Sequence, residues 1–133
     1  MSLDRIGLDE PGLIRAMGAF GGGIASTGRT CGCLTGGVAA ISRLFAKSNP
    51  DEKDDPAMWR LSYHLSKRFE ELTREHGGTD CKDIARVRWN DRDQVKNFYG
   101  DRDSRLLNIC APLAGETAFA LGELLDRHGE EKG

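Results

Sequence analysis

One stretch of the chain, residues 20–37, constrains the fold more than any other. It holds seven of the 17 glycines and two of the four cysteines, Cys31 and Cys33. Glycine adopts positive φ angles and lets the backbone approach other groups closely, at an entropic cost that an ordinary linker would avoid. The residues after Gly37 turn apolar, in the manner of a helix. The stretch therefore predicts a glycine-rich loop that delivers Cys31 to the start of a helix.

The spacing of apolar residues predicts an all-α protein, a compact bundle of five or six helices with the glycine-rich loop before the second. We expect helices at about residues 8–20, 32–47, 56–74, 79–84, 91–100 and 106–128. Pro112 favours a helix start just after Cys110. The third helix has the clearest apolar stripe, formed at three- and four-residue spacing and broadened by two aromatic residues: Met58, Leu61, Leu65, Phe69 and Leu72, with Trp59 and Tyr63.

Length and composition exclude several classes of protein. A chain of 133 residues predicts one domain over residues 1–133, with an ordered core at 8–125 and a frayed tail at 129–133. The net charge of −2 gives little support to nucleic-acid binding. No apolar run is long enough to span a membrane, so we expect no membrane insertion. The first residues lack the pattern of a secretory signal, which favours a cytoplasmic protein whose thiols stay reduced. In such a chain, four cysteines point to metal or redox chemistry.

Three cysteines fall at expected helix starts. Cys31 precedes the second helix, Cys81 lies in the first turn of the fourth, and Cys110 borders the last. A helix N-terminus offers unpaired N–H groups and about half a positive charge, which stabilise a thiolate. If the three starts converge, they form a pocket for thiolates, a metal ion or a small anionic cluster. Cys33 is expected to point away from Cys31, as a core residue or a fourth ligand.

These residues also resemble a known family. The run of Phe20 and the three glycines after it, the Cys31-Gly32-x-x-x-Gly36 motif, and the isolated Cys81 and Cys110 are similar to the putative redox-active protein family (C_GCAxxG_C_C), which has a CGAxxG motif and four cysteines. The resemblance spans about residues 8–125 and implies a small helical redox domain. It implies redox roles for Cys31, Cys81 and Cys110. The loop residues expected around a cofactor or anion are Gly21, Gly22, Gly23, Arg29, Gly32 and Gly36.

The chain departs from the family pattern at two places. Cys33 stands where the motif has alanine, and residues 1–30 contain no cysteine, whereas the family's first cysteine sits on a helix upstream of the loop. Two alternatives follow. That upstream helix is absent or truncated, or Cys33 substitutes for its thiol. Three thiolates alone would be an incomplete set for a four-thiolate iron–sulfur cluster.

Other motifs are weaker. Gly23-x-x-x-x-Gly28-Arg29-Thr30 approaches a phosphate-binding loop, but arginine replaces the required lysine and a helix is expected before it. The three histidines have no metal-ligand spacing. His64 is expected to pack beside the third helix's stripe, while His76 and His128 lie near helix C-termini, where a cation is favourable.

Three functions remain open. The first is a thiol redox or electron-transfer protein that uses Cys31, Cys81 and Cys110 with a redox partner. The second is a metal or iron–sulfur module with the same thiolates and Cys33 as a possible fourth ligand. The third is a non-catalytic helical interaction module. A face of small residues, Gly36, Ala39 and Ala40, could also receive a second copy of the chain as a homodimer.

Overall fold

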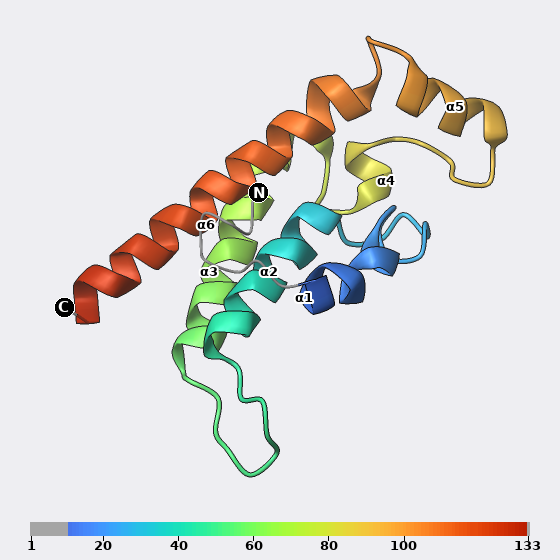
Figure 1. Ribbon diagram of the computed structural model, residues 1–133. Helices are drawn as coiled ribbons and strands as arrows, with labels where there is room; N and C mark the ends of the chain where they lie inside the picture. Colours follow the sequence, from blue (N-terminus) through green and yellow to red (C-terminus); the bar gives the residue numbers. More distant parts are fainter. Residues whose placement is uncertain (1–10, 133) are drawn as a thin grey trace.

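The computed structural model describes residues 11–132, and these residues form helices joined by loops (Figure 1). The helices are α1 (Pro11–Ala16), α2 (Gly32–Phe45), α3 (Ala57–Leu72), α4 (Cys81–Ile84), α5 (Arg92–Gly100) and α6 (Ala111–Lys132). Within this range the only β-type pairing is an isolated bridge between Thr30 and Asp80. No helix in the described part of the chain is long and apolar enough to cross a membrane. The prediction of an all-α bundle is confirmed.

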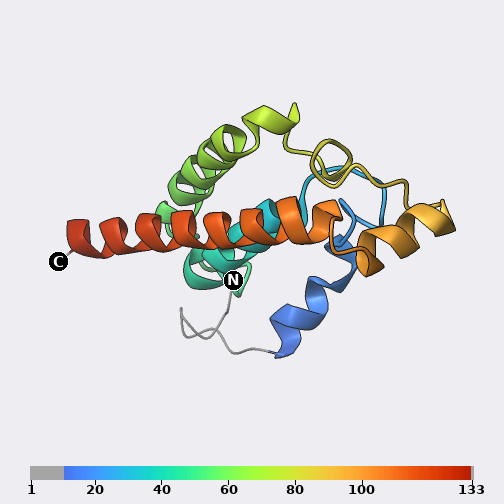
Figure 2. The same ribbon diagram turned by 90° about the horizontal axis from the view of Figure 1, so that it is seen from above.

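Helices α2, α3 and α6 pack against one another and form the main core (Figures 1 and 2). Their buried side chains come from one face of each helix, and the largest fully buried ones are Ile41, Leu61, Leu65, Phe69 and Leu121. The spacing of these residues along α3 is the three- and four-residue spacing of an amphipathic helix. Burial of each such side chain stabilises the fold by about 1.5–3 kcal/mol.

A glycine on α2 sets the distance between α2 and α3. A Cβ added to Gly37 would lie 2.6 Å from Cδ2 of Leu65, so any side chain there would require the buried Leu65 side chain to shift. The neighbouring Gly36, which the sequence places on a face of small residues, is in open space, because a Cβ there meets nothing within 4 Å. The glycine at the close approach between α2 and α3 is therefore Gly37 and not Gly36.

The apolar stripe of α3 is narrower than expected. Trp59 and Tyr63 are 71% and 59% exposed, so these aromatic side chains do not broaden the buried face. His64, expected to pack beside that stripe, is also exposed. His128 is instead buried, with its Nδ1 atom 2.9 Å from a guanidinium nitrogen of Arg60. A helical spacing locates the centre of a buried face, but the neighbouring helices determine its width.

Helices α4 and α5 lie at the end of the bundle where α6 begins (Figure 1). A second, smaller core forms there from Cys81, Ala85 and Phe98, with Trp89 and Cys110 packed against it. Helix α5 begins where the sequence predicts, because the Asp91 carboxylate accepts hydrogen bonds from the amides of the first turn. The small core places two of the four cysteines together.

The remaining helix ends differ by a few residues from those expected. The first helix is short, and a separate 3-10 turn follows it at Gly18–Phe20, while the expected residues 8–10 lie outside the described part. Helix α6 continues to Lys132, beyond the expected end at 128. A π-helical turn, Leu106–Cys110, precedes α6 without a break, so the predicted junction around Cys110 is a change of helix type.

Candidate thiol site

The glycine-rich loop contains a left-handed turn of five residues, Gly22–Ser26. Their φ angles are 65°, 75°, 67°, 53° and 57°. Three of the five, Ile24, Ala25 and Ser26, carry side chains, and a left-handed conformation costs each of them roughly 1–2 kcal/mol. The turn is closed by backbone hydrogen bonds, including one of 2.7 Å from the Ala25 amide to the Ala19 carbonyl. Such strain persists only where the surrounding structure enforces it, and it is found most often at functional sites.

The loop is pinned to the start of α4. The carbonyls of Arg29 and Gly28 accept hydrogen bonds from the amides of Cys81 (2.6 Å) and Lys82 (3.1 Å). A Cβ at Gly23 would lie 2.8 Å from Cβ of Cys81, which explains the glycine at that position. The Cys31 amide in turn donates to the Thr79 carbonyl at 3.1 Å. Cys31 and Cys81 are thereby held on neighbouring segments.

The same contacts remove the stabilisation that the start of α4 was expected to give a Cys81 thiolate. The first amides of α4 donate to loop carbonyls, so they are not free to stabilise a thiolate. Burial raises the pKa of the Cys81 thiol, and a contact with the indole N–H of Trp89 offsets this only in part. Cys81 is 9% exposed. It is therefore a protonated, packed thiol at neutral pH.

Cys110 does not lie at an open helix start either. It is the last residue of the π-helical turn, and the Ala111 amide continues the helix by donating to the Leu106 carbonyl. The pKa of the Cys110 thiol is raised to about 11, mainly by burial and in smaller part by the negative charges of Cys31 and Cys81. Cys110 packs against both the main core and the smaller one. Its position connects the two.

Cys31 is different, because it is the N-cap residue of α2. Its backbone, with φ −59° and ψ 136°, is not helical, while Gly32 and Cys33 begin the helix. The pKa of Cys31 is lowered to about 7, and the largest cause is the hydrogen-bonding influence of the Cys33 thiol, which burial opposes. The amides of Cys33 and Leu34 also contribute to this low pKa, although neither makes a cap hydrogen bond of good geometry to the sulfur.

The two thiols of the Cys31-Gly32-Cys33 segment therefore lie close enough for each to be the largest influence on the pKa of the other. The expectation that they diverge is wrong, because it treats both residues as helical, and Cys31 precedes the helix. The hydrogen bond to Cys31 and burial both raise the pKa of Cys33, so this thiol keeps its proton. Together they form a thiolate with an adjacent thiol donor.

All four cysteines interact electrostatically, and Cys31 is the member that affects each of the others. All four are free thiols. Among residues 11–132, however, no three His, Cys, Asp or Glu side chains are placed so that they could hold a metal ion. The donor set does not fit a thiolate-bound metal or an iron–sulfur cluster as it stands, because a structural metal site needs four such ligands.

An apolar pocket adjoins the thiol pair. It has a volume of about 390 Å³ and lies between α1, α2 and α6, with Cys33 in its wall. Side chains of α1 and α6 form much of the remaining wall, among them Leu13, Ile14, Met17 and Leu121. Sequence reasoning does not reveal this pocket, because its walls come from three separate helices.

The loop residues expected around a cofactor have several different roles. Gly22 and Gly23 belong to the left-handed turn, and Gly21 precedes it. Gly32 and Gly36 line the apolar pocket. The Arg29 side chain is exposed, and it is not among the groups that shift the pKa of Cys31. Sequence reasoning missed several close approaches, among them those at Gly28, against Cβ of Lys82 at 3.2 Å, and at Gly37.

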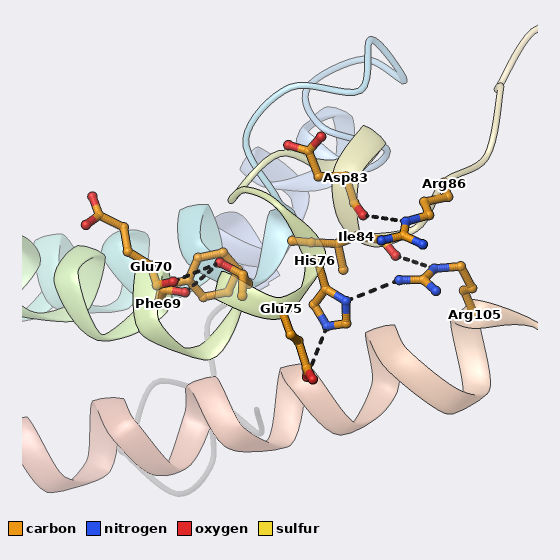
Figure 3. A network of polar contacts seen from close by, with 9 residues as sticks. Phe69, Glu70, Glu75, His76, Asp83, Ile84, Arg86 and Arg105 are labelled. Carbon is orange, nitrogen blue, oxygen red and sulfur yellow. Dashed lines mark hydrogen bonds and ion pairs between the residues drawn. The ribbon is translucent and has the colours of Figure 1, made fainter.

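A polar network fixes α4 against the start of α6 (Figure 3). Arg105 donates from Nε to the Ile84 carbonyl at 2.7 Å, and its Nη2 lies 3.3 Å from Nδ1 of His76. His76 Nε2 is 3.6 Å from the Glu75 carboxylate. The guanidinium therefore joins the end of α4 to the turn after α3. This contact helps to hold Cys81 near Cys110, whose pKa the Arg105 charge lowers slightly.

Comparison with known proteins identifies the family. The family model described as "Putative redox-active protein (C_GCAxxG_C_C)" matches residues 1–124. The chain belongs to this family, whose description places it among redox-active proteins. Neither the curated proteins nor the solved structures contain a match.

Proposed function

We propose that this member of the redox-active family exchanges thiols and disulfides with a redox partner, and that Cys31 is its attacking thiolate. The observation that supports the proposal is the N-cap position of Cys31, where a neighbouring thiol and two amides lower its pKa to about 7. At pH 7 about half of Cys31 is then ionised, whereas burial keeps Cys81 and Cys110 protonated.

The reaction begins with attack of the Cys31 thiolate on a disulfide of the partner. A mixed disulfide forms, and the partner's second sulfur leaves as a thiolate that takes a proton from solvent. A second thiol of this chain then attacks the Cys31 sulfur and releases the partner in its reduced form, so that two electrons pass to the partner. An attacking thiol whose pKa is close to the ambient pH reacts fastest, because it combines a large thiolate fraction with high nucleophilicity. Cys31 meets that condition.

Cys81 and Cys110 belong to the same redox site in this proposal. Both lie within electrostatic range of Cys31, and Cys110 packs against the core on the Cys31 side as well as against Cys81. Their high pKa values suit reserve thiols that react only after Cys31 has done so. The loop strain at Gly22–Ser26 is consistent with a segment held in place for chemistry.

The test is site-resolved alkylation of the reduced full-length chain across pH 5–10. We expect the rate at Cys31 to rise with a midpoint near pH 7, while Cys81 and Cys110 react slowly until well above pH 8. Metal analysis and an absorption spectrum of protein purified without oxygen accompany it. Stoichiometric iron or zinc, with thiols protected until chelation, would replace the proposal by a metal-binding function. A Cys31 midpoint above pH 8.5 without metal would refute both.

A further inference from the structure

We propose that Cys33 is the resolving thiol, which closes a Cys31–Cys33 disulfide across Gly32 and releases the partner in its reduced form. This inference rests on the proposed attack by Cys31. It concerns a residue that stands where the family motif has alanine, so it assigns this chain a dithiol that the motif alone does not contain.

The geometry of the α2 start supports this pairing. Cys31 is the N-cap residue and Cys33 the second residue of the helix, so one glycine separates them, and each thiol is the largest influence on the pKa of the other. Gly32 between them is exposed, and a Cβ added to it would meet only the Phe20 carbonyl oxygen, at 3.9 Å. The backbone at Gly32 therefore has room to adjust when the two sulfurs approach to the length of a disulfide bond, about 2.05 Å.

The other two cysteines are more firmly held. The Cys81 amide donates to the Arg29 carbonyl at 2.6 Å, and the Gly23 backbone packs against its Cβ. Cys110 lies inside a continuous run of helix from the π-helical turn into α6. A bond from Cys31 to either residue would join two separate elements of the fold. A bond to Cys33 requires only a local change within one turn.

The step balances in atoms and electrons. In the mixed disulfide, the Cys31 sulfur is bonded to a sulfur of the partner. The Cys33 thiol loses its proton, its sulfur attacks the Cys31 sulfur, and the bond from Cys31 to the partner breaks. The partner's sulfur leaves with the bonding electron pair and takes a proton. The dithiol has then lost two electrons to the partner's disulfide, which is the oxidant.

The charge of Cys31 explains the order of the two steps. Before the first step, the hydrogen bond and charge of Cys31 raise the pKa of Cys33, so Cys33 waits as a protonated donor. Once Cys31 is bonded to the partner, its charge is gone, and those two influences on the Cys33 pKa disappear. Burial is then the main cause that still raises it. Cys33 is only partly buried: it packs against the main core and also lines the apolar pocket.

The test uses oxidised glutathione as the disulfide and the reduced full-length chain. After an acid quench and alkylation, trypsin separates the cysteines into three peptides, residues 30–43, 75–82 and 106–127. We expect the 30–43 peptide to lose two hydrogens and carry no alkyl group, while the other two peptides are fully alkylated. A cross-link from 30–43 to either of the other peptides would overturn the inference and leave the proposed function intact.

Variants separate the two proposals. In Cys33→Ala, glutathione should stay attached to Cys31, and its release should slow by about tenfold or more, since an intramolecular thiol is lost. Cys81→Ala and Cys110→Ala compare the two reserve thiols with Cys33, and a slowing in either variant as large as that expected for Cys33→Ala would overturn the inference. Release from Cys33→Ala at the wild-type rate would overturn the inference. Absence of any adduct on Cys31, in wild type and all variants alike, would instead overturn the proposed function. Circular dichroism confirms that each variant is folded.

Discussion

The ionisation of Cys31 can be tested through its neighbour. In Cys33→Ala the chain recovers the alanine of the family motif and loses the thiol hydrogen bond that contributes most to the low pKa of Cys31. A hydrogen bond to a charged group contributes about 1.5–3 kcal/mol, and a thiol is a weak donor, so we take about 1.4 kcal/mol, or about one pKa unit. We expect the midpoint to move from about 7 to about 8, because the amides of residues 33 and 34 remain.

The reaction rate does not simply follow the thiolate fraction. At pH 7 that fraction falls from about half to about a tenth, which alone would slow the reaction about fivefold. The thiolate of the variant is more basic, however, and with a Brønsted slope of about 0.4–0.5 it is about threefold more nucleophilic. The net change at pH 7 is therefore about twofold or less, whereas the plateau above pH 9 rises about threefold. The distinctive result is the crossing of the two pH profiles.

The assay is the rate of alkylation of Cys31 by iodoacetamide from pH 5 to 10, read from fragment masses of the 30–43 peptide. Cys33→Ser is the matched control, since its hydroxyl keeps a donor beside the Cys31 sulfur and should hold the midpoint near 7. The reasoning would be refuted if Cys33→Ala kept a midpoint near 7, or if the serine variant shifted as far as the alanine variant.

Three further predictions concern the loop, the core and the buried thiols. Ala25→Gly should stabilise the protein by about 0.5–1 kcal/mol in urea unfolding, because it relieves a left-handed φ of 53°; a loss of stability would show that the turn is not strained. Gly37→Ala should lower the free energy of unfolding by about 1–3 kcal/mol, because its Cβ clashes with Leu65. Gly36→Ala, in open space, should raise it by about 0.5–1 kcal/mol, and equal effects of the two variants would contradict the packing. Stability should fall as pH rises from about 8.5 to 11, since the unfolded Cys110 thiol ionises there while the folded one, with a pKa of about 11, keeps its proton. In Cys110→Ala, stability measured by thermal unfolding should decrease less with pH over this range. An unchanged dependence on pH would show that other groups cause the decrease.

The sequence carries enough information for the fold class, because helices are encoded locally. The stripe Leu61, Leu65 and Phe69 has helical spacing and is buried, and Asp91 caps α5 as its position predicts. The exposure of Trp59 and Tyr63 could not be predicted in the same way. Whether an aromatic residue beside a stripe is covered depends on how far the neighbouring helix reaches, and that distance is set by tertiary contacts such as Gly37 against α3.

The thiol site shows the same division between local and non-local information. The helix start at Cys31 follows from sequence, and so does its low pKa in direction. The left-handed turn does not, because Ile24 and Ala25 are not residue types that favour positive φ. Only the contact between the loop and α4 shows that loop carbonyls accept hydrogen bonds from the amides of Cys81 and Lys82. Three helix starts that look equivalent in the sequence are therefore different in the structure.

This difference determines which thiol ionises. Charges of the same sign repel strongly in a partly buried cluster, so the four neighbouring thiols cannot all be thiolates near neutral pH. The α4 start is closed by the loop, and the π-helical turn runs into α6 without exposing a helix N-terminus, so of the three helix starts that bear cysteines only that of α2 keeps amides beside a sulfur. The one negative charge of the cluster therefore lies on Cys31, and this charge raises the pKa of each of the other three thiols. Oxidation of Cys31 removes that charge, and we expect the remaining thiols to become more acidic together. The reactivity of the whole cluster therefore depends on the state of one residue.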